Sequence, residues 1–302
     1  MFYQGLAVTP ETTEVLVRRL RLPLQAPAFA DETWRAENAE HLSTGIVVDC
    51  ETTGLDAHRD ALIELAMVPF LYDRRSGTVV AYGEAFSGLE DPGSPLTPEI
   101  IALTGLTDDA VRGQHIDRKR ALEILRSAAI VIAHNAGFDR PFIEGFLDVS
   151  DNERRPIWGC SLEQVDWAAS GIPAAKLEVL TVFHGFFIGN HRAEADAAGT
   201  LHLLTLEDPS TGQSYLQGVL TKMREPSVLL QAFGSAFETK ERLRLRGYKW
   251  HAAKRVWQKV VAKVNLEAEE RWLTSDVYNG KYQGIVEDIP VHSRFRHREE
   301  NM

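Results

Sequence analysis

The stretch IVVDCETTGLD, residues 46–56, constrains the fold of this chain more than any other feature. Its first three residues, 46–48, are apolar and typical of a buried strand, yet Asp49 and Glu51 follow them directly. Side chains alternate along a strand, so these two acids share one face while Cys50 points to the other. Burying charge is costly unless a partner or an ion compensates for it. The fold must therefore supply that compensation at the end of an apolar strand.

Composition indicates a soluble globular protein of one large or two modest domains. The chain has 302 residues, of which 44% are hydrophobic and 25% charged. No apolar run approaches the roughly 20 residues that span a bilayer, and the first residues lack the pattern of a secretory signal. Two cysteines do not make a disulfide framework and suit a reducing compartment. We expect a cytoplasmic protein without membrane association.

The order of the segments predicts an α/β domain followed by a small α+β domain. Strand-like runs come first, at residues 45–50, 61–72, 78–86 and 129–135, and helical patterns dominate later. A turn-rich stretch, DPSTGQSYLQG, suggests a linker before a second unit. The predicted divisions are an N-terminal arm at 1–44, an α/β domain at 45–206, a linker at 207–226 and an accessory domain at 227–302.

Asp49 and Glu51 are candidates for half of a metal site. Two neighbouring carboxylates repel each other unless one is protonated or a cation lies between them. Oxygen ligands of this kind suit Mg²⁺ and similar hard cations. The alternative is the start of a solvated loop, which is the commoner explanation for an isolated Asp-x-Glu.

Two later segments supply further polar residues. IVIAHNAGFDRPF runs from an apolar strand into a helix start that carries Asp139, and GNHRAEADAAG supplies His191 and Asp196. On one helix the last two would lie about 140° apart, so we expect His191 in a loop and Asp196 on the helix that follows. His191 could then transfer protons while Asp196 binds metal. Taken singly, they could equally be a loop histidine and a first-turn acid favoured by the helix dipole.

Together, VVDCETTGL, AHNAGFD and HRAEAD resemble, in that order, the three exonuclease motifs of the DEDDh family. This DnaQ-like group includes the proofreading subunit of bacterial DNA polymerase III, ribonuclease T and oligoribonuclease. The resemblance covers about residues 45–206, and LTGLT at 103–107 resembles the segment that links the motifs. It implies a ribonuclease H-like fold, with a mixed five-stranded sheet flanked by helices.

The resemblance also implies a role for each matching residue. Two divalent ions, Mg²⁺ or Mn²⁺, would be held by Asp49, Glu51, Asp139 and Asp196, with His191 as general base. The terminal nucleotide would be held by Thr52, Thr53 and Leu55, and the site supported by His134, Asn135 and Phe138. Two ions about 4 Å apart can stabilise both the attacking and the departing oxygen of a phosphodiester, which would account for acids at the end of an apolar strand.

The C-terminal domain combines basic and aromatic residues. Nine Lys or Arg and one Glu lie between Lys240 and Lys263, in a chain whose net charge is −10. Aromatic rings can stack on bases while cations pair with phosphates; the alternative is that the tryptophans form a hairpin core and the cations are merely solvated. LRLRGYKWHAAKRVWQKVV resembles a segment that follows the exonuclease domain in some bacterial polymerase III epsilon-like exonucleases. The candidate nucleic-acid contacts are Arg244, Arg246, Lys249, Trp250, Lys254, Arg255 and Trp257.

The implied function is a metal-dependent 3′→5′ exonuclease that releases nucleoside 5′-monophosphates. The expected partners are a single-stranded DNA or RNA 3′ end, together with replication or repair proteins. A rival interpretation is a catalytically idle nucleic-acid-binding or scaffold protein on the same fold, against which the complete set of five motif residues argues. The motifs do not separate DNA from RNA.

Overall fold

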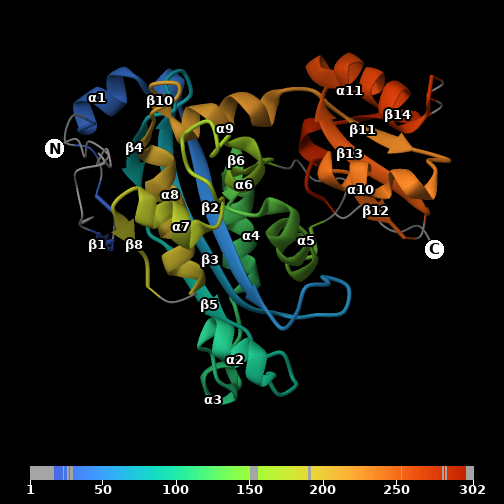
Figure 1. Cartoon of the computed structure of the whole chain (residues 1–302). Coiled ribbons are helices and arrows are strands. Elements are labelled where there is room, and N and C mark those ends of the chain that lie inside the picture. Colours follow the sequence, from blue (N-terminus) through green and yellow to red (C-terminus); the bar gives the residue numbers. More distant parts are fainter. Residues whose placement is uncertain are drawn as a thin grey trace. The chain divides into compact units, whose positions relative to one another are not determined.

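The computed structural model describes residues 17–22, 24, 25, 27, 30–149, 156–189, 192–252, 254–280, 282 and 284–296. The chain divides into two compact units, called unit 1 (Met1–Met223) and unit 2 (Arg224–Met302) below (Figure 1).

Unit 1 is built on a mixed sheet. In the order β4-β3-β2-β6-β7, β2 pairs antiparallel with β3 and parallel with β6, and β5 also pairs with β3. The predicted α/β class with a mixed sheet flanked by helices is confirmed. The strands are β2 (Leu42–Thr52), β3 (Leu62–Asp73), β4 (Val79–Tyr82), β5 (Phe86–Leu89), β6 (Ile130–Ala133) and β7 (Ile157–Cys160).

The strand count was wrong: the described residues of this sheet form six strands where five were predicted. The single strand predicted over 78–86 is two strands, which pair with different parts of β3. Pro69 lies between those two parts, and a proline has no N–H with which to continue a ladder. The ladder therefore ends where Gly83 N donates to Pro69 O, and pairing with β3 resumes at Phe86.

The long β2–β3 pair carries the apolar centre of the sheet. Its register runs from Leu42 opposite Asp73 to Glu51 opposite Glu64, and shifts between Glu51 and Thr52. β3 is buried along most of its length, as expected for a strand covered on both faces. Polar residues consequently gather at the end of the pair where β2 stops.

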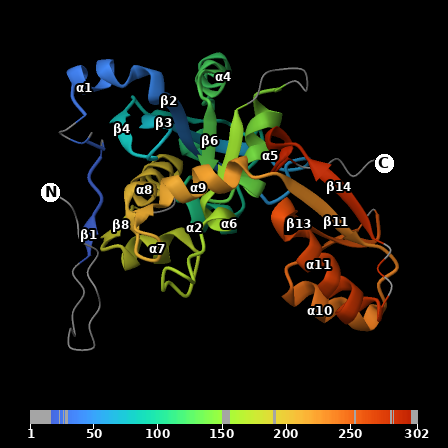
Figure 2. The same ribbon diagram turned by 90° about the horizontal axis from the view of Figure 1, so that it is seen from above.

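Helices cover both faces of the sheet (Figure 2). α7, α8 and α9 lie on one side and α4 on the other. Side chains of β2 and β6 pack against α8 and α9 in the main core cluster. The helices of unit 1 beyond its arm are α2 (Pro98–Thr104), α3 (Asp108–Val111), α4 (Arg118–Ser127), α5 (Ala136–Phe146), α6 (Ser161–Gln164), α7 (Leu177–Phe183), α8 (Ala193–Thr205) and α9 (Tyr215–Arg224).

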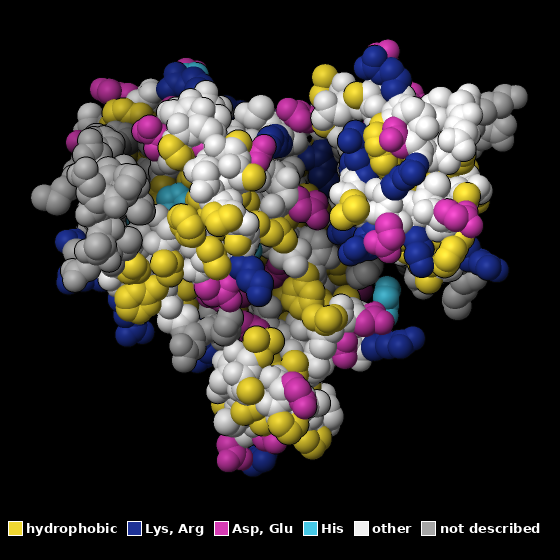
Figure 3. All heavy atoms as spheres, viewed as in Figure 1, with side chains coloured by type: hydrophobic (Ala, Val, Ile, Leu, Met, Phe, Trp, Pro, Cys, Tyr) yellow, Lys and Arg dark blue, Asp and Glu magenta, His cyan; other side chains and the backbone are white. Residues whose placement is uncertain are grey.

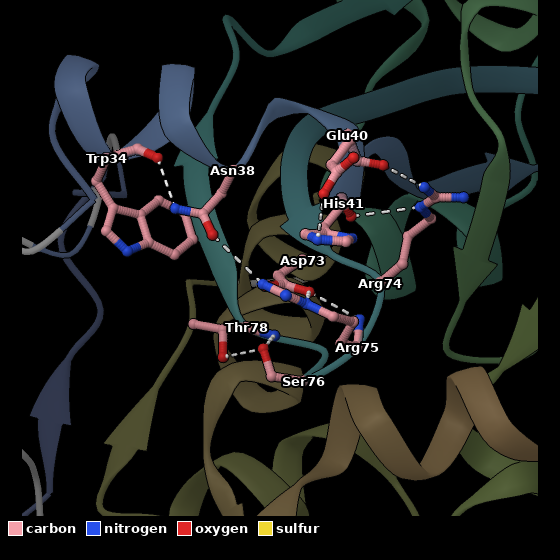
Figure 4. Close-up of polar contacts among 9 residues, drawn as sticks. All are labelled: Trp34, Asn38, Glu40, His41, Asp73, Arg74, Arg75, Ser76 and Thr78. Atoms are coloured by element: carbon pink, nitrogen blue, oxygen red, sulfur yellow. Dashed lines mark hydrogen bonds and ion pairs between the residues drawn. The ribbon is translucent and has the colours of Figure 1, made fainter.

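The described part of the N-terminal arm is attached to the α/β fold. β1 (Arg18–Arg19) pairs in parallel with β8 (Phe186–Phe187). Next come α1 (Glu32–Glu37) and the 3-10 helix η1 (Ala39–His41), which are tied to the turn after β3 (Figure 4). There Arg75 donates to Asn38 Oδ1 at 3.4 Å and forms an ion pair with Asp73.

The segment predicted as a linker, residues 207–226, is mostly ordered structure. It contains the short hairpin β9 (Glu207–Asp208) and β10 (Gln213–Ser214), followed by α9. Five apolar side chains of α9 are buried in the main core of unit 1: Tyr215, Leu216, Val219, Leu220 and Met223. Their helical spacing explains the difference, because it gives α9 an apolar face that must be covered.

Unit 2 is the predicted α+β domain. Its sheet has the order β12-β13-β11-β14, and every neighbouring pair is antiparallel. Val228, Leu230 and Leu243 belong to its core cluster. The elements are β11 (Ser227–Ala232), η2 (Phe237–Thr239), α10 (Lys240–Leu245), β12 (Lys249–His251), β13 (Val256–Ala262), η3 (Lys263–Asn265), α11 (Leu266–Trp272), the π-helix η4 (Leu273–Val277), β14 (Ile285–Ile289) and η5 (Val291–Ser293).

Candidate active site

Three carboxylates meet where β2 ends and α8 begins. Asp49 and Glu51 come from β2, and Asp196 comes from the first turn of α8. Each offers an oxygen that lies within 4.8 Å of the others, and all three residues are half-buried. The predicted placement of the two strand acids on one face explains why both reach Asp196. Such a set of oxygens fits one or more hard divalent cations.

Asp139 lies on α5 beside this group, in the first turn of the helix, and is only 3% exposed. Its Oδ1 is 3.5 Å from Sγ of Cys50, within hydrogen-bonding distance. It is not one of the three carboxylates that converge within 4.8 Å. The four predicted ligands thus lie close together. The carboxylates of three of them converge, and the fourth, Asp139, accepts a hydrogen bond from the thiol of Cys50.

Burial raises the pKa values of Asp49, Glu51 and Asp139, and neighbouring carboxylates add to the effect for Asp49 and Glu51. Burial raises the pKa of Asp49 well above its usual range, and the nearby carboxylates of Asp139 and Asp196 add to the effect. Burial also raises the pKa of Glu51 to about 8, with Asp196 and Glu64 contributing and Arg192 opposing. Burial raises the pKa of Asp139 to about 7. A group of acids that resists ionisation on its own is suited to bound cations.

The loop after β2 is ordered by its own side chains. Thr52 is buried and donates to Gly54 O at 2.6 Å. Thr53 Oγ1 accepts from Ala61 N at 2.9 Å, and the backbone N–H of Thr53 donates back to Ala61 O. Leu55, in contrast, is 85% exposed. Of the three residues predicted to hold a terminal nucleotide, two fix the loop and the third projects from it.

The predicted supporting residues connect β6 to its surroundings. His134 contacts Ser161 Oγ through Nδ1 and Ala175 O through Nε2, each at 2.8 Å. Asn135 begins α5, and the ring of Phe138 packs against that of Phe142 with centroids 5.0 Å apart. The contacts of His134 fix the end of β6 directly before α5, the helix that carries Asp139. His191, the predicted general base, lies outside the described residues.

Two residues next to the carboxylates were not predicted from the sequence. Glu64 on β3 is 1% exposed, and its carboxylate accepts from Arg192 and from the backbone of Ala193. The sequence did contain an indication for Glu64. An acid inside the apolar run of β3 needs a partner that compensates for its burial, as Asp49 does. Its partner could not be read from the sequence, since Arg192 is separated from it by 128 residues.

The comparison with known families agrees with this geometry. Residues 46–204 match the family model RNase_T, described as Exonuclease. The chain belongs to this exonuclease family. The match spans every predicted motif residue and confirms the resemblance to DnaQ-like exonucleases.

Relatives of the exonuclease region include much longer proteins. The chain is 34% identical over 178 residues to the PolC-type DNA polymerase III of Halalkalibacterium halodurans, covering 56% of this chain and 12% of that protein. It is 35% identical over 189 residues to the PolC-type DNA polymerase III of Listeria monocytogenes, covering 60% of this chain and 12% of that one. The chain therefore spans only about an eighth of the length of these relatives.

Solved exonuclease structures are also similar. E. coli exonuclease I in complex with a dA16 oligonucleotide aligns with a TM-score of 0.46 at 20% identity, over 64% of this chain and 48% of that one. Another exonuclease I structure aligns with a TM-score of 0.48 at 20% identity, over 83% of this chain and 63% of that one.

No helix among the described residues is long and apolar enough to span a membrane.

Unit 2 lies outside the residues that match the exonuclease model. Some of its predicted nucleic-acid contacts have partners inside the unit: Arg244 pairs with Glu241 at 2.9 Å and Arg246 with Glu269 at 3.2 Å. The ring of Trp257 packs against the core, and Trp250 beside it is 51% exposed. Lys254 and Arg255 lie in the turn between β12 and β13, and Lys249 lies on β12. Figure 3 shows Lys and Arg side chains interspersed with acidic ones on the visible face of unit 2.

Proposed function

We propose that this protein is a metal-dependent 3′→5′ exonuclease that hydrolyses the terminal phosphodiester of DNA or RNA and releases nucleoside 5′-monophosphates. The observation that carries the proposal is the convergence of the Asp49, Glu51 and Asp196 carboxylates within 4.8 Å, inside a domain of the exonuclease family. A protein that only bound nucleic acid would gain nothing from three carboxylates crowded together in this way.

The donor set fits the proposed cofactor. Asp49, Glu51 and Asp196 would hold divalent cations directly, and Asp139 would complete the set from α5. When bound, two such ions, Mg²⁺ or Mn²⁺, would stabilise the charge that develops on the attacking and leaving oxygens.

The remaining steps fall to side chains of the chain. His191 would accept the proton of the attacking water, which a group with an ordinary pKa of about 6.5 can do near neutral pH. Leu55, projecting from the loop fixed by Thr52 and Thr53, would pack against the terminal base. Binding an end rather than a sequence would make hydrolysis start at the terminus and proceed one nucleotide at a time.

The likeness to PolC-type DNA polymerase III supports a replication or repair context. The proposed substrate is a single-stranded 3′ end. We propose that unit 2 contributes contacts to the strand beyond its first nucleotides, through basic residues on α10 and around β12.

A digestion panel tests the proposal. The purified protein is incubated with Mg²⁺ or Mn²⁺ and with single-stranded, duplex and mismatched DNA and short and long RNA, each labelled at the 5′ end. The expected result is a descending ladder with mononucleotide products, absent in EDTA and on circular single strands. Immediate release of a labelled 5′ mononucleotide would contradict the direction. Tight strand binding without any metal-dependent hydrolysis would favour the idle binding protein.

A further inference from the structure

Glu64 is a buried acid directly beside the proposed metal site. It stands opposite Glu51 in the β2–β3 register, where cross-strand neighbours have Cβ atoms about 5 Å apart. Like charges in such positions repel each other. Glu64 nevertheless has 1% of its surface exposed, so its charge needs a fixed partner.

Arg192 is that partner, and the contact is two-pronged. Its Nε lies 3.0 and 3.1 Å from the two carboxylate oxygens of Glu64, and its Nη2 lies 2.8 Å from Oε1. Oε2 also accepts from the backbone N–H of Ala193 at 3.2 Å. Ala193 is the first residue of α8, and Arg192 provides no side-chain cap for that helix. The carboxylate of Glu64 therefore caps α8 from a neighbouring strand.

Arg192 of this ion pair lies between two proposed site residues in the sequence, His191 and Asp196. Arg192 follows His191 directly, and its carbonyl accepts the N–H of Asp196 one helical turn later. Glu64 is thus joined to the point where the segment carrying the proposed base meets the helix carrying a proposed ligand. A rigid link from β3 to this point sets the distance of Asp196 from the acids of β2.

We propose that Glu64 and Arg192 are positioning residues that clamp the start of α8, so that Asp196 meets Asp49 and Glu51 in the geometry required for metal binding. This inference rests on the proposed function and deepens it, because it concerns the same site. Residues that orient metal ligands without touching the metal typically alter affinity or activity by about 10–100-fold when changed.

Two conservative variants test the clamp. Arg192→Lys keeps the charge but loses the planar fork that binds both oxygens, and Glu64→Gln keeps the shape but loses the charge. For each we expect kcat to fall by about tenfold or more, with KM for an oligonucleotide within about twofold. The affinity for Mn²⁺, measured by calorimetry without nucleic acid, should also fall by about tenfold. The double variant should lose no more than the worse single one, because both remove one interaction.

Asp73 and Arg75 provide a matched control. Asp73 is the last residue of β3 and forms an ion pair with Arg75 in the turn that follows, Nη2 to Oδ2 at 2.9 Å, in which the arginine is 55% and the acid 6% exposed (Figure 4). The corresponding values for Arg192 and Glu64 are 50% and 1%. Asp73 pairs with Leu42, at the other end of β2 from Glu51, and nine residues of strand span about 30 Å. Asp73→Asn and Arg75→Lys should lower the melting temperature while leaving Mn²⁺ affinity and kcat unchanged.

The outcomes separate the clamp from the proposed function. If the Glu64 and Arg192 variants lose only thermal stability, as the controls do, the pair is merely structural and the inference is wrong. Additive losses in the double variant would also overturn it. If the wild-type protein binds Mn²⁺ but hydrolyses nothing, the proposed function fails while Mn²⁺ affinity still tests the clamp. If wild type binds no Mn²⁺, both fail. Should Glu64→Gln not fold, the half-exposed Arg192→Lys carries the test.

Discussion

Sγ of Cys50 lies 3.5 Å from Oδ1 of Asp139, so the residue that separates two carboxylates of β2 contacts a third acid on α5. Cys50 points away from the face shared by Asp49 and Glu51. Burial, together with the Asp139 carboxylate, raises the pKa of the Cys50 thiol well above its usual range. The thiol therefore remains protonated and available as a donor to Asp139.

Removing one carboxylate should abolish hydrolysis without unfolding the protein. We expect Asp49→Asn and Asp139→Asn each to lower kcat by at least about a hundredfold, because each removes a charged ligand from a two-metal site. Their melting temperatures in EDTA should equal or exceed that of the wild type, since a crowded charge is lost. Release of mononucleotides from labelled single-stranded DNA measures the effect, with Asp73→Asn as control. Wild-type rates in either variant would refute the assignment.

The metal-free protein should become less stable as the pH rises from about 4 to about 8. The folded-state pKa values of Glu51, about 8, and Asp139, about 7, lie above the ordinary values of 4.5 and 3.8. Within this window the folded protein holds protons that the unfolded chain has released, so raising the pH favours unfolding. Divalent cations bind the ionised carboxylates, so their stabilising effect should instead grow with pH.

Melting temperatures at pH 6 and pH 8, in EDTA and in Mg²⁺ or Mn²⁺, check this dependence. In the double variant Asp49→Asn/Glu51→Gln the fall in EDTA should shrink and the gain with metal should disappear. A larger gain from metal at pH 6 than at pH 8 would contradict the prediction.

Leu55→Ala should weaken substrate binding and leave the fold unchanged. The side chain is 85% exposed, so truncating it removes little buried surface, and surface changes of this kind alter stability by about 0.5 kcal/mol or less. If Leu55 packs on the terminal base, KM for a short oligonucleotide should rise about tenfold, equivalent to about 1.4 kcal/mol. Leu245→Ala, at an 80% exposed leucine of unit 2, is the control. An equal effect of both changes, or none, would argue against the contact.

Removing unit 2 should reduce affinity for long strands without removing chemistry. A chain that ends at Glu225 keeps α9 and the whole core of unit 1. It should retain single-turnover cleavage at saturating substrate, but bind long oligonucleotides more weakly and with a shallower dependence of log K on log salt, because fewer phosphates are neutralised. Fluorescence anisotropy across a salt series measures both quantities.

The basic residues of unit 2 should be altered in two groups. Changing Arg244, Lys249 and Lys254 to Ala should reproduce much of the loss in affinity. Arg246→Ala should be made separately, because it would leave the buried carboxylate of Glu269 with one fewer partner and lower stability. Unchanged affinity and salt slope in the truncated protein would show that the basic stretch does not bind the strand.

Local patterns predicted the parts of the site that depend on local geometry. The period of two along β2 placed Asp49 and Glu51 on one face, and both approach Asp196 as expected. The angle of about 140° between positions 191 and 196 on a single helix placed Asp196 on the helix after a loop, and Asp196 lies in the first turn of α8. The helical spacing of Tyr215, Leu216 and Val219 was also visible, but the turn residues before it favoured a linker.

The rest depended on contacts between distant segments. The residues next to Arg192 and Glu64 in the sequence do not indicate that the two form an ion pair. The register of β2 with β3 places Glu64 opposite Glu51 and so brings the pair to the site. The sequence allowed two interpretations of Trp257, and its partly buried ring packs against the core of unit 2, to which Leu243 of α10 also belongs. Whether such a side chain is solvated or packed depends on segments distant in the sequence, so neighbouring residues do not predict it.

The loop from Thr52 to Ala61 is held by its own hydrogen bonds, among them Asp56 N to Asp60 Oδ2 at 2.8 Å. The Asp60 carboxyl also fills the space beside Gly54, where an added Cβ would lie 2.4 Å from it. The loop therefore loses its conformational entropy when the chain folds. A nucleic-acid terminus that binds against it has a smaller entropy cost to offset. Discrimination between substrates would then depend on the fit of the terminus to a fixed surface rather than on a rearrangement that each substrate must induce.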